Sequence, residues 1–444
     1  MKLKIDEKYK FIVMITLSIL VGAAVGFIGS LFHLSIDWIS SSRNDFLEYF
    51  SVFGKYRWIP YVVTSTVMIF VAVHLVRKIA PEACGSGIQE IEGILEDKRE
   101  INAIRVLFVK FFGGMMSLGS GMAMGREGPT VQIGGTIGQL LSEFLHLKKD
   151  DIKILIAAGA GAGLATTFNA PLAGILFVFE EMRKQFKYCY TSVQSVVTAC
   201  VVSTMVLYVM MGNYIDLPVK TVLTPNVYDM WIFVVFGALF GIIGYIFNIL
   251  LIKFTTAFSN LDGIKFNIST LIIGVSIGFL LYKYPYTVGE GYNTIHLSLS
   301  SNLSITLLLS LFLIRFFITM VSYGTGAPGG IFAPMLALGI LFGIAFGKVV
   351  MILLPNFPID PTVFAIVGMS ALFSATVRAP LTGIVLVAEL TMSFNLLLPF
   401  LITSLAATIT VSAMGGRPIY TILLERELQV SKFGLSQDNK ETAS

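Results

Sequence analysis

The chain has 444 residues, of which 55% are hydrophobic and 13% are charged, and its formal net charge is +4. A soluble domain carries about 25% charged residues, so a surface this poor in charge needs a lipid bilayer as its solvent. Lysine and arginine are scattered between apolar runs, which argues against a nucleic-acid partner. Continuous apolar runs also exclude the alternating strands of a membrane barrel, so we expect an all-α polytopic membrane protein.

A helix needs about 20 residues to span the hydrocarbon. Helices near that length are predicted at residues 11–34, 59–76, 191–211, 231–252, 305–321 and 396–413. Shorter helices, broken by glycine or proline, are predicted at 130–141, 154–163, 172–179, 331–347 and 381–390. We expect a single transmembrane domain at residues 1–424 and a short cytoplasmic tail at 425–444. Basic residues near both ends place both termini in the cytoplasm by the positive-inside tendency.

The sequence contains an internal repeat. Gly85-Ser86-Gly87 recurs as Gly289-Glu290-Gly291 at an offset of 204 residues, and Gly125-x-x-x-Pro129 recurs as Gly330-x-x-x-Pro334 at an offset of 205. Ala170-Pro171-Leu172 recurs as Ala379-Pro380-Leu381 at an offset of 209, which Glu180 and Glu389 share. The matches predict two related halves, about 11–211 and 228–414, either parallel or inverted. Broken helices at matching places in two halves indicate the binding site of a transporter.

Glycine-rich junctions at 85–88, 125–129 and 326–334 each precede or open an apolar helix. A helix N-terminus leaves N–H groups unpaired and carries about half a positive charge, and glycine lets a ligand approach the backbone. Three such ends at repeat-related positions predict an anion site built from partial charges. Helix packing through small residues is the alternative. Ser86 would then be an anion ligand, an N-cap, or both.

Glu127 lies between Arg126 and Gly128 at one of these helix starts. A carboxylate within a membrane segment is costly and tends to be functional or paired. When deprotonated, Glu127 could occupy the anion site, and when protonated it would be displaced, which makes it a candidate gate and proton carrier. A structural ion pair with Arg126 is the alternative.

Two further groups of charged residues lie in apolar surroundings. Glu180 and Glu181 end one short helix and point in different directions. Because Glu389 matches Glu180 in the repeat, we expect these two residues to share a packing role. Glu181 has no acidic counterpart, so we expect it to be the proton-relay residue. An interfacial charge near Arg183 and Lys184 is the alternative for Glu181. Lys110 needs an acidic partner, and we expect a structural ion pair with Glu92.

No metal or cofactor is expected. The four histidines have no ligand spacing, the three cysteines have no disulfide or metal pattern, and neither a P-loop nor a nucleophile–base motif is present. These residues are His33, His74, His146, His296, Cys84, Cys189 and Cys200. The chain is therefore not expected to be an enzyme.

Residues 85–88, 125–129 and 329–334 together resemble the three signature stretches of the CLC chloride channels and transporters, and 168–175 and 415–420 are also similar. The resemblance extends over about residues 11–424. It implies a homodimer in the plasma membrane with one anion pathway per subunit, built from inverted halves. The chloride-coordinating positions it implies are Ser86, Gly125, Glu127, Ile331, Phe332 and Tyr420.

The same resemblance makes Glu127 the external gating glutamate and Glu181 the internal proton glutamate, which exchangers have and channels generally lack. It therefore predicts a chloride/proton antiporter with chloride as the substrate ion. A passive voltage- or pH-gated chloride channel and a fluoride/proton exchanger are the alternatives, and Ser86 argues against the second. One position departs from the family, since Gln89 stands where proline usually follows Gly-Ser-Gly-Ile. We expect this change to cost little, because residues other than proline can occupy a first helical turn.

Overall fold

The computed structural model describes residues 8–49, 54–183, 188–212, 217, 219, 224–355 and 360–429. Throughout these residues the regular structure is helical, apart from one isolated β-bridge between Gly125 and Gly330. The predicted all-α fold is therefore confirmed. Of the expected tail, residues 425–429 belong to a C-terminal helical stretch, 419–429, and residues 430–444 lie outside the described part of the chain.

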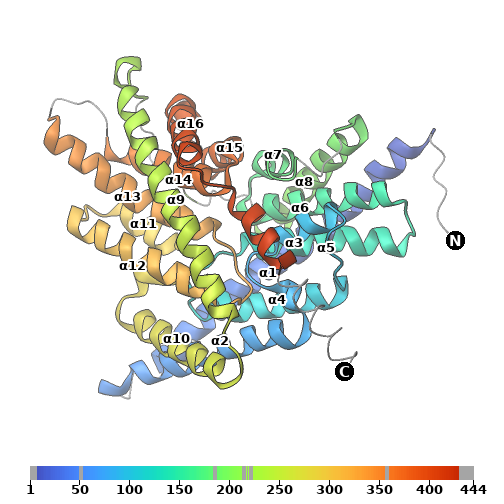
Figure 1. The fold of residues 1–444 in the computed structure, drawn as a ribbon, viewed down its shortest axis with the longest axis horizontal. Helices are drawn as coiled ribbons and strands as arrows, with labels where there is room; N and C mark the ends of the chain where they lie inside the picture. The colour runs from blue at the N-terminus through green and yellow to red at the C-terminus, as the bar shows by residue number, and fades with distance from the viewer. Residues whose placement is uncertain are drawn as a thin grey trace.

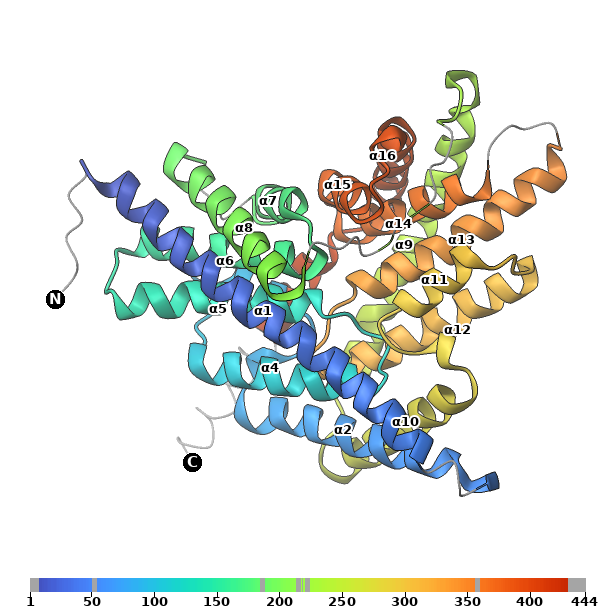
Figure 2. The same cartoon turned by 180° about the vertical axis from the view of Figure 1, so that it is seen from behind.

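The helices fall into two sets of eight (Figures 1 and 2). The first set is α1 (Lys10–Tyr49), α2 (Trp58–Ile79), α3 (Ile88–Leu95), α4 (Ala103–Gly119), α5 (Glu127–Phe144), α6 (Lys149–Phe168), α7 (Pro171–Glu180) and α8 (Tyr190–Met211). The second set is α9 (Trp231–Ser259), α10 (Gly263–Lys283), α11 (Tyr292–Ser300), α12 (Ile305–Gly324), α13 (Phe332–Leu353), α14 (Pro361–Val377), α15 (Pro380–Thr391) and α16 (Leu397–Ala413). Equivalent helices pack together in each set. Helix α5 packs with α6 in the first set, and α13 packs with α14 in the second; likewise α1 packs with α8, and α9 packs with α16.

Local sequence signals account for many of the helix starts. The Asn102 side chain accepts from the Arg105 N–H at 3.1 Å at the start of α4, and the Asp360 side chain caps α14 in the same way at 2.7 Å. Helices α7, α14 and α15 begin with proline. Proline suits the first helical position because its fixed φ is helical and its missing N–H would have no intrahelical partner there.

Within the described residues, nine helices are long and apolar enough to cross a membrane. Two of them, α6 and α13, were predicted to be short, but they have 20 and 22 residues. Their glycines are contact points and not breaks. A Cβ on Gly134 of α5 would lie 2.1 Å from the Gly159 carbonyl of α6, so these glycines let two helices touch along their backbones. Another candidate span, α10, was not among the predicted helices.

The short helices α7 and α15 are antiparallel and cap each other. Glu180, the last residue of α7, accepts the N–H groups of Leu381 and Thr382 at 3.1 and 2.8 Å at the start of α15. Glu389, near the end of α15, accepts the N–H groups of Leu172 and Ala173 at 3.2 and 2.8 Å at the start of α7. Each C-terminal end therefore lies beside the other helix's N-terminal end, which is the arrangement of inverted halves. The shared packing role predicted for Glu180 and Glu389 is this reciprocal capping.

Candidate functional site

The three glycine-rich loops meet and are hydrogen-bonded to one another. Gly125 and Gly330 exchange backbone hydrogen bonds of 2.8 and 2.6 Å, and the Gly329 N–H donates to the Gly85 carbonyl at 2.9 Å. Gly85 and Gly87 have φ of +56° and +82°, a region that glycine reaches without steric cost. The contacts bring the N-terminal ends of α3, α5 and α13 to one point in the interior. The sequence predicted this convergence from the repeat.

Ser86 lies at this meeting point. A Cβ on Gly128 would lie 2.2 Å from the Ser86 Oγ, so only a glycine on α5 leaves room for the hydroxyl. The backbone N–H of Ser86 donates to the Tyr323 hydroxyl at 3.3 Å. Ser86 is fully buried, and among the described side chains its hydroxyl interacts with the Tyr420 hydroxyl. The Ser86 side chain does not cap α3.

Tyr420 and Phe332 close the site opposite Ser86. The Tyr420 hydroxyl interacts with the Ser86 side chain and, at longer range, with the carboxylates of Glu127 and Glu181. The rings of Tyr420 and Phe332 are 6.1 Å apart between centroids. Phe332 is the first residue of α13, and Ile331 is its N-cap. The predicted anion-binding residues thus lie together, and Ser86, Glu127, Ile331, Phe332 and Tyr420 are all fully buried.

The Glu127 carboxylate lies over the loop that precedes it. A Cβ on Gly125 would lie 2.0 Å from Glu127 Oε2, and one on Gly330 would lie 3.4 Å from the same oxygen. The carboxylate has no side-chain hydrogen-bond partner among the described residues, and it interacts with the backbone N–H groups of Glu127 and Ala333, at the starts of α5 and α13. The alternative of an ion pair with Arg126 is not supported, because Arg126 lies 3.7 Å from Asp37 and 3.7 Å from Glu290 instead.

Lys110 does not form the predicted ion pair with Glu92. Its fully buried ammonium donates to the carbonyl oxygens of Ala83 and Gly85, at 3.0 and 2.7 Å. These carbonyls belong to the loop that carries Ser86. A charged donor satisfies buried backbone acceptors more strongly than a neutral one, so Lys110 fixes the position of the loop.

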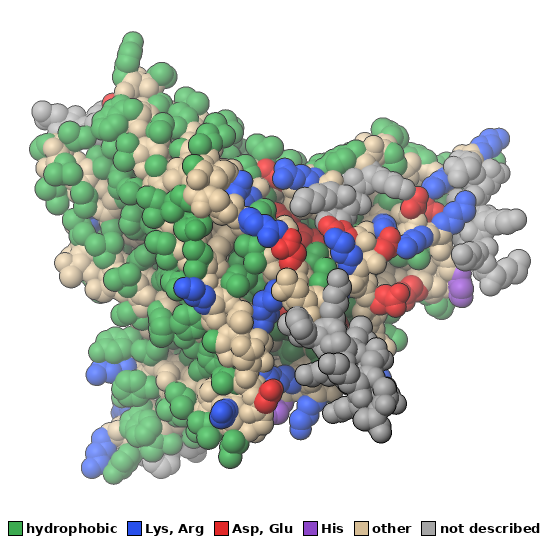
Figure 3. Space-filling view, viewed as in Figure 1, with side chains coloured by type: hydrophobic (Ala, Val, Ile, Leu, Met, Phe, Trp, Pro, Cys, Tyr) green, Lys and Arg blue, Asp and Glu red, His purple; other side chains and the backbone are tan. Residues whose placement is uncertain are grey.

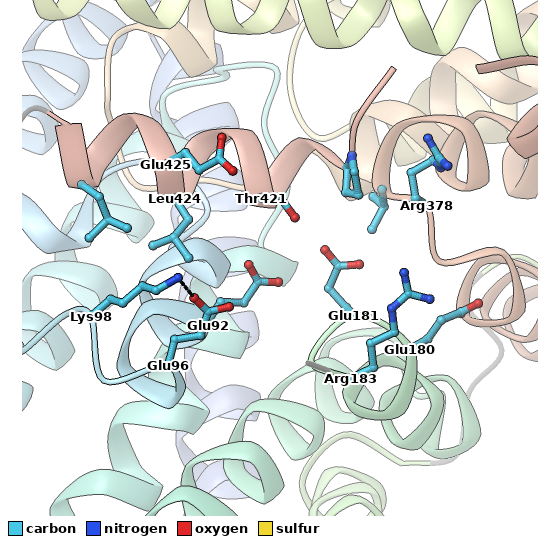
Figure 4. Close-up of a pocket in the computed structure, with 13 residues that line it drawn as sticks. Glu92, Glu96, Lys98, Glu180, Glu181, Arg183, Arg378, Thr421, Leu424 and Glu425 are labelled. Atoms are coloured by element: carbon cyan, nitrogen blue, oxygen red, sulfur yellow. Dashed lines mark ion pairs between the residues drawn. The ribbon is translucent and has the colours of Figure 1, made fainter. Parts of the chain in front are cut away.

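Glu181 and Glu92 line a charged cavity of about 130 Å³ on the face shown in Figures 1 and 3. Figure 4 shows Glu181 and Arg183 entering from the end of α7, and Glu92 entering from α3. Thr421 contributes from the C-terminal helical stretch, one residue beyond Tyr420. The cavity therefore lies beside the segment that carries Tyr420, although Tyr420 itself does not line it. Arg183 is close, as the alternative for Glu181 assumed, while Lys184 lies outside the described residues.

Sequence reasoning missed two residues that organise the other side of the site. Glu290 was noted only as the middle of a repeat match, and Arg315 was not singled out. The missed signal was the repeat itself, since Arg315 follows Lys110 at an offset of 205 residues.

The chain is similar in sequence and in structure to known proteins. The sequence model of the family described as "Voltage gated chloride channel" matches residues 67–412. An H(+)/Cl(-) exchange transporter ClcA of Vibrio vulnificus is 44% identical over 422 residues, which cover 94% of this chain and 90% of the relative. The crystal structure of a slow cyanobacterial Cl-/H+ antiporter is 37% identical, with a TM-score of 0.90 over 94% of this chain and 98% of that one. A CLC-type fluoride/proton antiporter, at 19% identity and a TM-score of 0.74, covers 91% of this chain and 96% of its own, and shares the fold.

Proposed function

The chain belongs to the family of voltage-gated chloride channels, and from that premise we propose that it exchanges chloride for protons across the membrane. Relatives named as H(+)/Cl(-) exchange transporters, and the similar cyanobacterial antiporter, support coupled exchange. Chloride is the substrate ion and the proton is the counter-substrate.

The observation that carries the proposal is the position of the Glu127 carboxylate against Gly125 and Gly330, where the glycine-rich loops and three helix N-termini meet. Partial charges on N–H groups attract an anion, and a buried hydroxyl can donate to it. A carboxylate in the same place competes with chloride, because both are anions that prefer the same positive ends. Protonation removes the charge of Glu127 and its preference for the site. Chloride entry and proton uptake are thereby linked at one group.

Glu181 supplies the second proton site in this proposal. Its cavity shares no lining residue with the cavity that Arg126 lines next to Glu127, and Tyr420 interacts electrostatically with both carboxylates. Glu181 is half-buried and lines a cavity, and an acidic residue in such a place in a membrane protein is a candidate for a proton relay. Protons would pass between Glu181 and Glu127, while chloride passes by Ser86 and Tyr420.

We place the cavity of Glu181 on the cytoplasmic side. Lys10, at the start of α1, pairs with Asp151 of α6 at 3.0 Å. Lys149 and Lys153, in the first turns of α6, pair with Asp97. Figure 3 has charged side chains gathered over the middle and right of this face, next to apolar surroundings. Excess lysine and arginine favour the cytoplasmic side. The start of α1 and the C-terminal helical stretch would then both be cytoplasmic, in a multi-pass protein of the plasma membrane.

We also infer a homodimer, which the resemblance to CLC proteins implies. Helices α7 and α15 have 10 and 12 residues, so each is about 15–18 Å long. The hydrocarbon core is about 30 Å thick, so lipid alone suits these helices poorly. Leu172 and Leu381, at their N-terminal ends, are 53% and 50% exposed. A second copy covering this pair would remove both from lipid.

The proposed exchange is tested with purified protein in liposomes, using chloride and pH electrodes together. We expect chloride efflux to drive proton uptake. Glu127→Gln should keep chloride flux and lose proton movement, because glutamine cannot titrate. Glu181→Gln should also uncouple the two ions. Wild-type chloride flux without any pH change would support the passive channel, and fluoride outcompeting chloride would support the fluoride exchanger.

A further inference from the structure

The second half of the chain repeats the loop that carries Ser86, but with a carboxylate in its place. Gly289 and Gly291 have φ of +73° and +119°, and Gly85 and Gly87 of the first loop likewise have positive φ. Gly291 is the N-cap of α11, and Gly87 is the N-cap of α3. Glu290 therefore occupies the position in the second half that Ser86 occupies in the first.

Both loops are fixed by a buried cation from the equivalent helix. Lys110 of α4 donates to two carbonyls of the first loop. Arg315 of α12, also fully buried, donates to the carbonyls of Tyr286, Val288 and Gly289 and to the Thr294 hydroxyl, at 2.8–3.1 Å. Arg315 thus fixes the backbone of the second loop, and this backbone sets the direction of the Glu290 side chain.

Glu290 lines a cavity of about 640 Å³, distinct from that of Glu181. Its Oε2 is 3.7 Å from the Nε of Arg126, the residue next to Glu127, and it interacts electrostatically with Glu127. Its Oε1 is buried without a hydrogen-bond partner among the described residues. The titratable and charged groups around it are His33, Asp37 and Arg43 of α1, Tyr61 of α2, Arg126 and Glu127 at the start of α5, Tyr282 of α10, Tyr292 and His296 of α11, and Arg315 of α12.

We propose that Glu290 is the outer proton-relay residue of this protein, the group through which protons pass between the outer cavity and Glu127. The inference rests on the proposed chloride/proton exchange and on the cytoplasmic placement of Glu181. Glu290 has a side chain only 15% exposed, yet it faces a cavity and lies beside the gate. Arg126 lies between the two carboxylates and is a positioning residue, since its guanidinium cannot titrate.

The proposed step is a proton transfer. A proton from the outer cavity binds the Glu290 carboxylate and gives the neutral acid. Cavity water then carries a proton from Glu290 to the Glu127 carboxylate, so that Glu290 is again ionised and Glu127 becomes neutral. The pair of carboxylates thereby gains one proton and one unit of positive charge, and the reverse sequence releases the proton outside.

The test is the rate of chloride-driven proton transport in liposomes as a function of pH on the Glu290 side, for wild type, Glu290→Gln and Glu290→Asp. Glutamine preserves shape and cannot carry a proton. We expect Glu290→Gln to slow transport about tenfold near neutral pH, with recovery when that side is acidified by about one to two pH units. Glu290→Asp should retain most of the rate. Chloride binding measured by calorimetry should be unchanged in both variants.

Asp37→Asn is the matched control, because it also removes one carboxylate 3.7 Å from Arg126. If Glu290 relays protons, Asp37→Asn leaves the pH profile in place. The inference is overturned if Glu290→Gln has the wild-type profile, if Asp37→Asn shifts the profile equally, or if Glu290→Gln loses chloride binding. A wild-type protein that moves no protons would instead refute the proposed exchange, so the two failures are distinguishable.

Discussion

Replacing Glu389 by alanine would remove one of the two carboxylates that join the inverted halves. Its oxygens accept the N–H groups of Leu172 and Ala173 at 3.2 and 2.8 Å. A hydrogen bond to a charged group contributes about 1.5–3 kcal/mol. Glu389 is partly exposed, so the lower value applies to each bond, and the loss should be about 3 kcal/mol. Glu389→Gln keeps one acceptor oxygen and should lose about half of that.

The measurement is the unfolding rate of the detergent-solubilised protein at fixed temperature, because membrane proteins of this size commonly unfold irreversibly. The cap joins two helices from different halves, so it must break when the halves separate. A loss of about 3 kcal/mol then corresponds to an increase in unfolding rate of up to about 100-fold. Glu180→Ala should unfold at least as fast, since Glu180 accepts two N–H groups of α15 and also the Thr382 hydroxyl at 2.8 Å.

Glu425→Ala is the control, because the Glu425 carboxylate pairs with Arg417 where both side chains are about half exposed. Such surface pairs contribute about 0–1 kcal/mol, so this variant should unfold at nearly the wild-type rate. Equal unfolding rates for Glu389→Ala and Glu425→Ala would refute the reasoning. The double variant at Glu180 and Glu389 should fall short of additivity, because both caps hold the same helix pair.

Two further substitutions test the first half of the site. Gln89→Pro should be neutral or stabilise by up to about 1 kcal/mol, because Gln89 is the second residue of α3, where the N–H has no intrahelical acceptor. Thermal unfolding and a competition between chloride and nitrate would check it, and an altered anion preference would show that the glutamine amide acts on the ion. Lys110→Met should weaken chloride binding about tenfold, equivalent to about 1.4 kcal/mol, because the Ser86 loop loses two hydrogen bonds to Nζ. Calorimetry would measure this, and unchanged affinity would mean that the loop holds its position without Lys110.

The repeat made most of the site predictable from sequence. The matched glycine motifs located the loops, and two loop-to-loop contacts, Gly125 with Gly330 and Gly85 with Gly329, bring together residues more than 200 positions apart. The prediction was weakest where a residue type has two uses. Gly163 indicated the end of a short helix, although in α6 it allows close packing against α5. Lys110 indicated a carboxylate partner, although backbone carbonyls satisfy it. Choosing between such uses requires knowing which surfaces meet, and local sequence does not contain that information.

The two buried cations also differ in a way that suits the side chains they position. Arg315 makes three hydrogen bonds to the carbonyls of its loop and one to Thr294 of α11, while Lys110 makes two to its loop. A guanidinium is a rigid fork of donors, whereas an ammonium rotates on a flexible stem. The loop with Glu290 is therefore held more firmly than the loop with Ser86. In the proposed relay, the carboxylate stays close to Arg126 throughout the cycle, while the hydroxyl proposed to bind chloride adjusts as the ion arrives and leaves. The two halves therefore share one backbone arrangement at this loop. They differ in the residue at the loop centre, Ser86 or Glu290, and in the cation that binds the loop, Lys110 or Arg315.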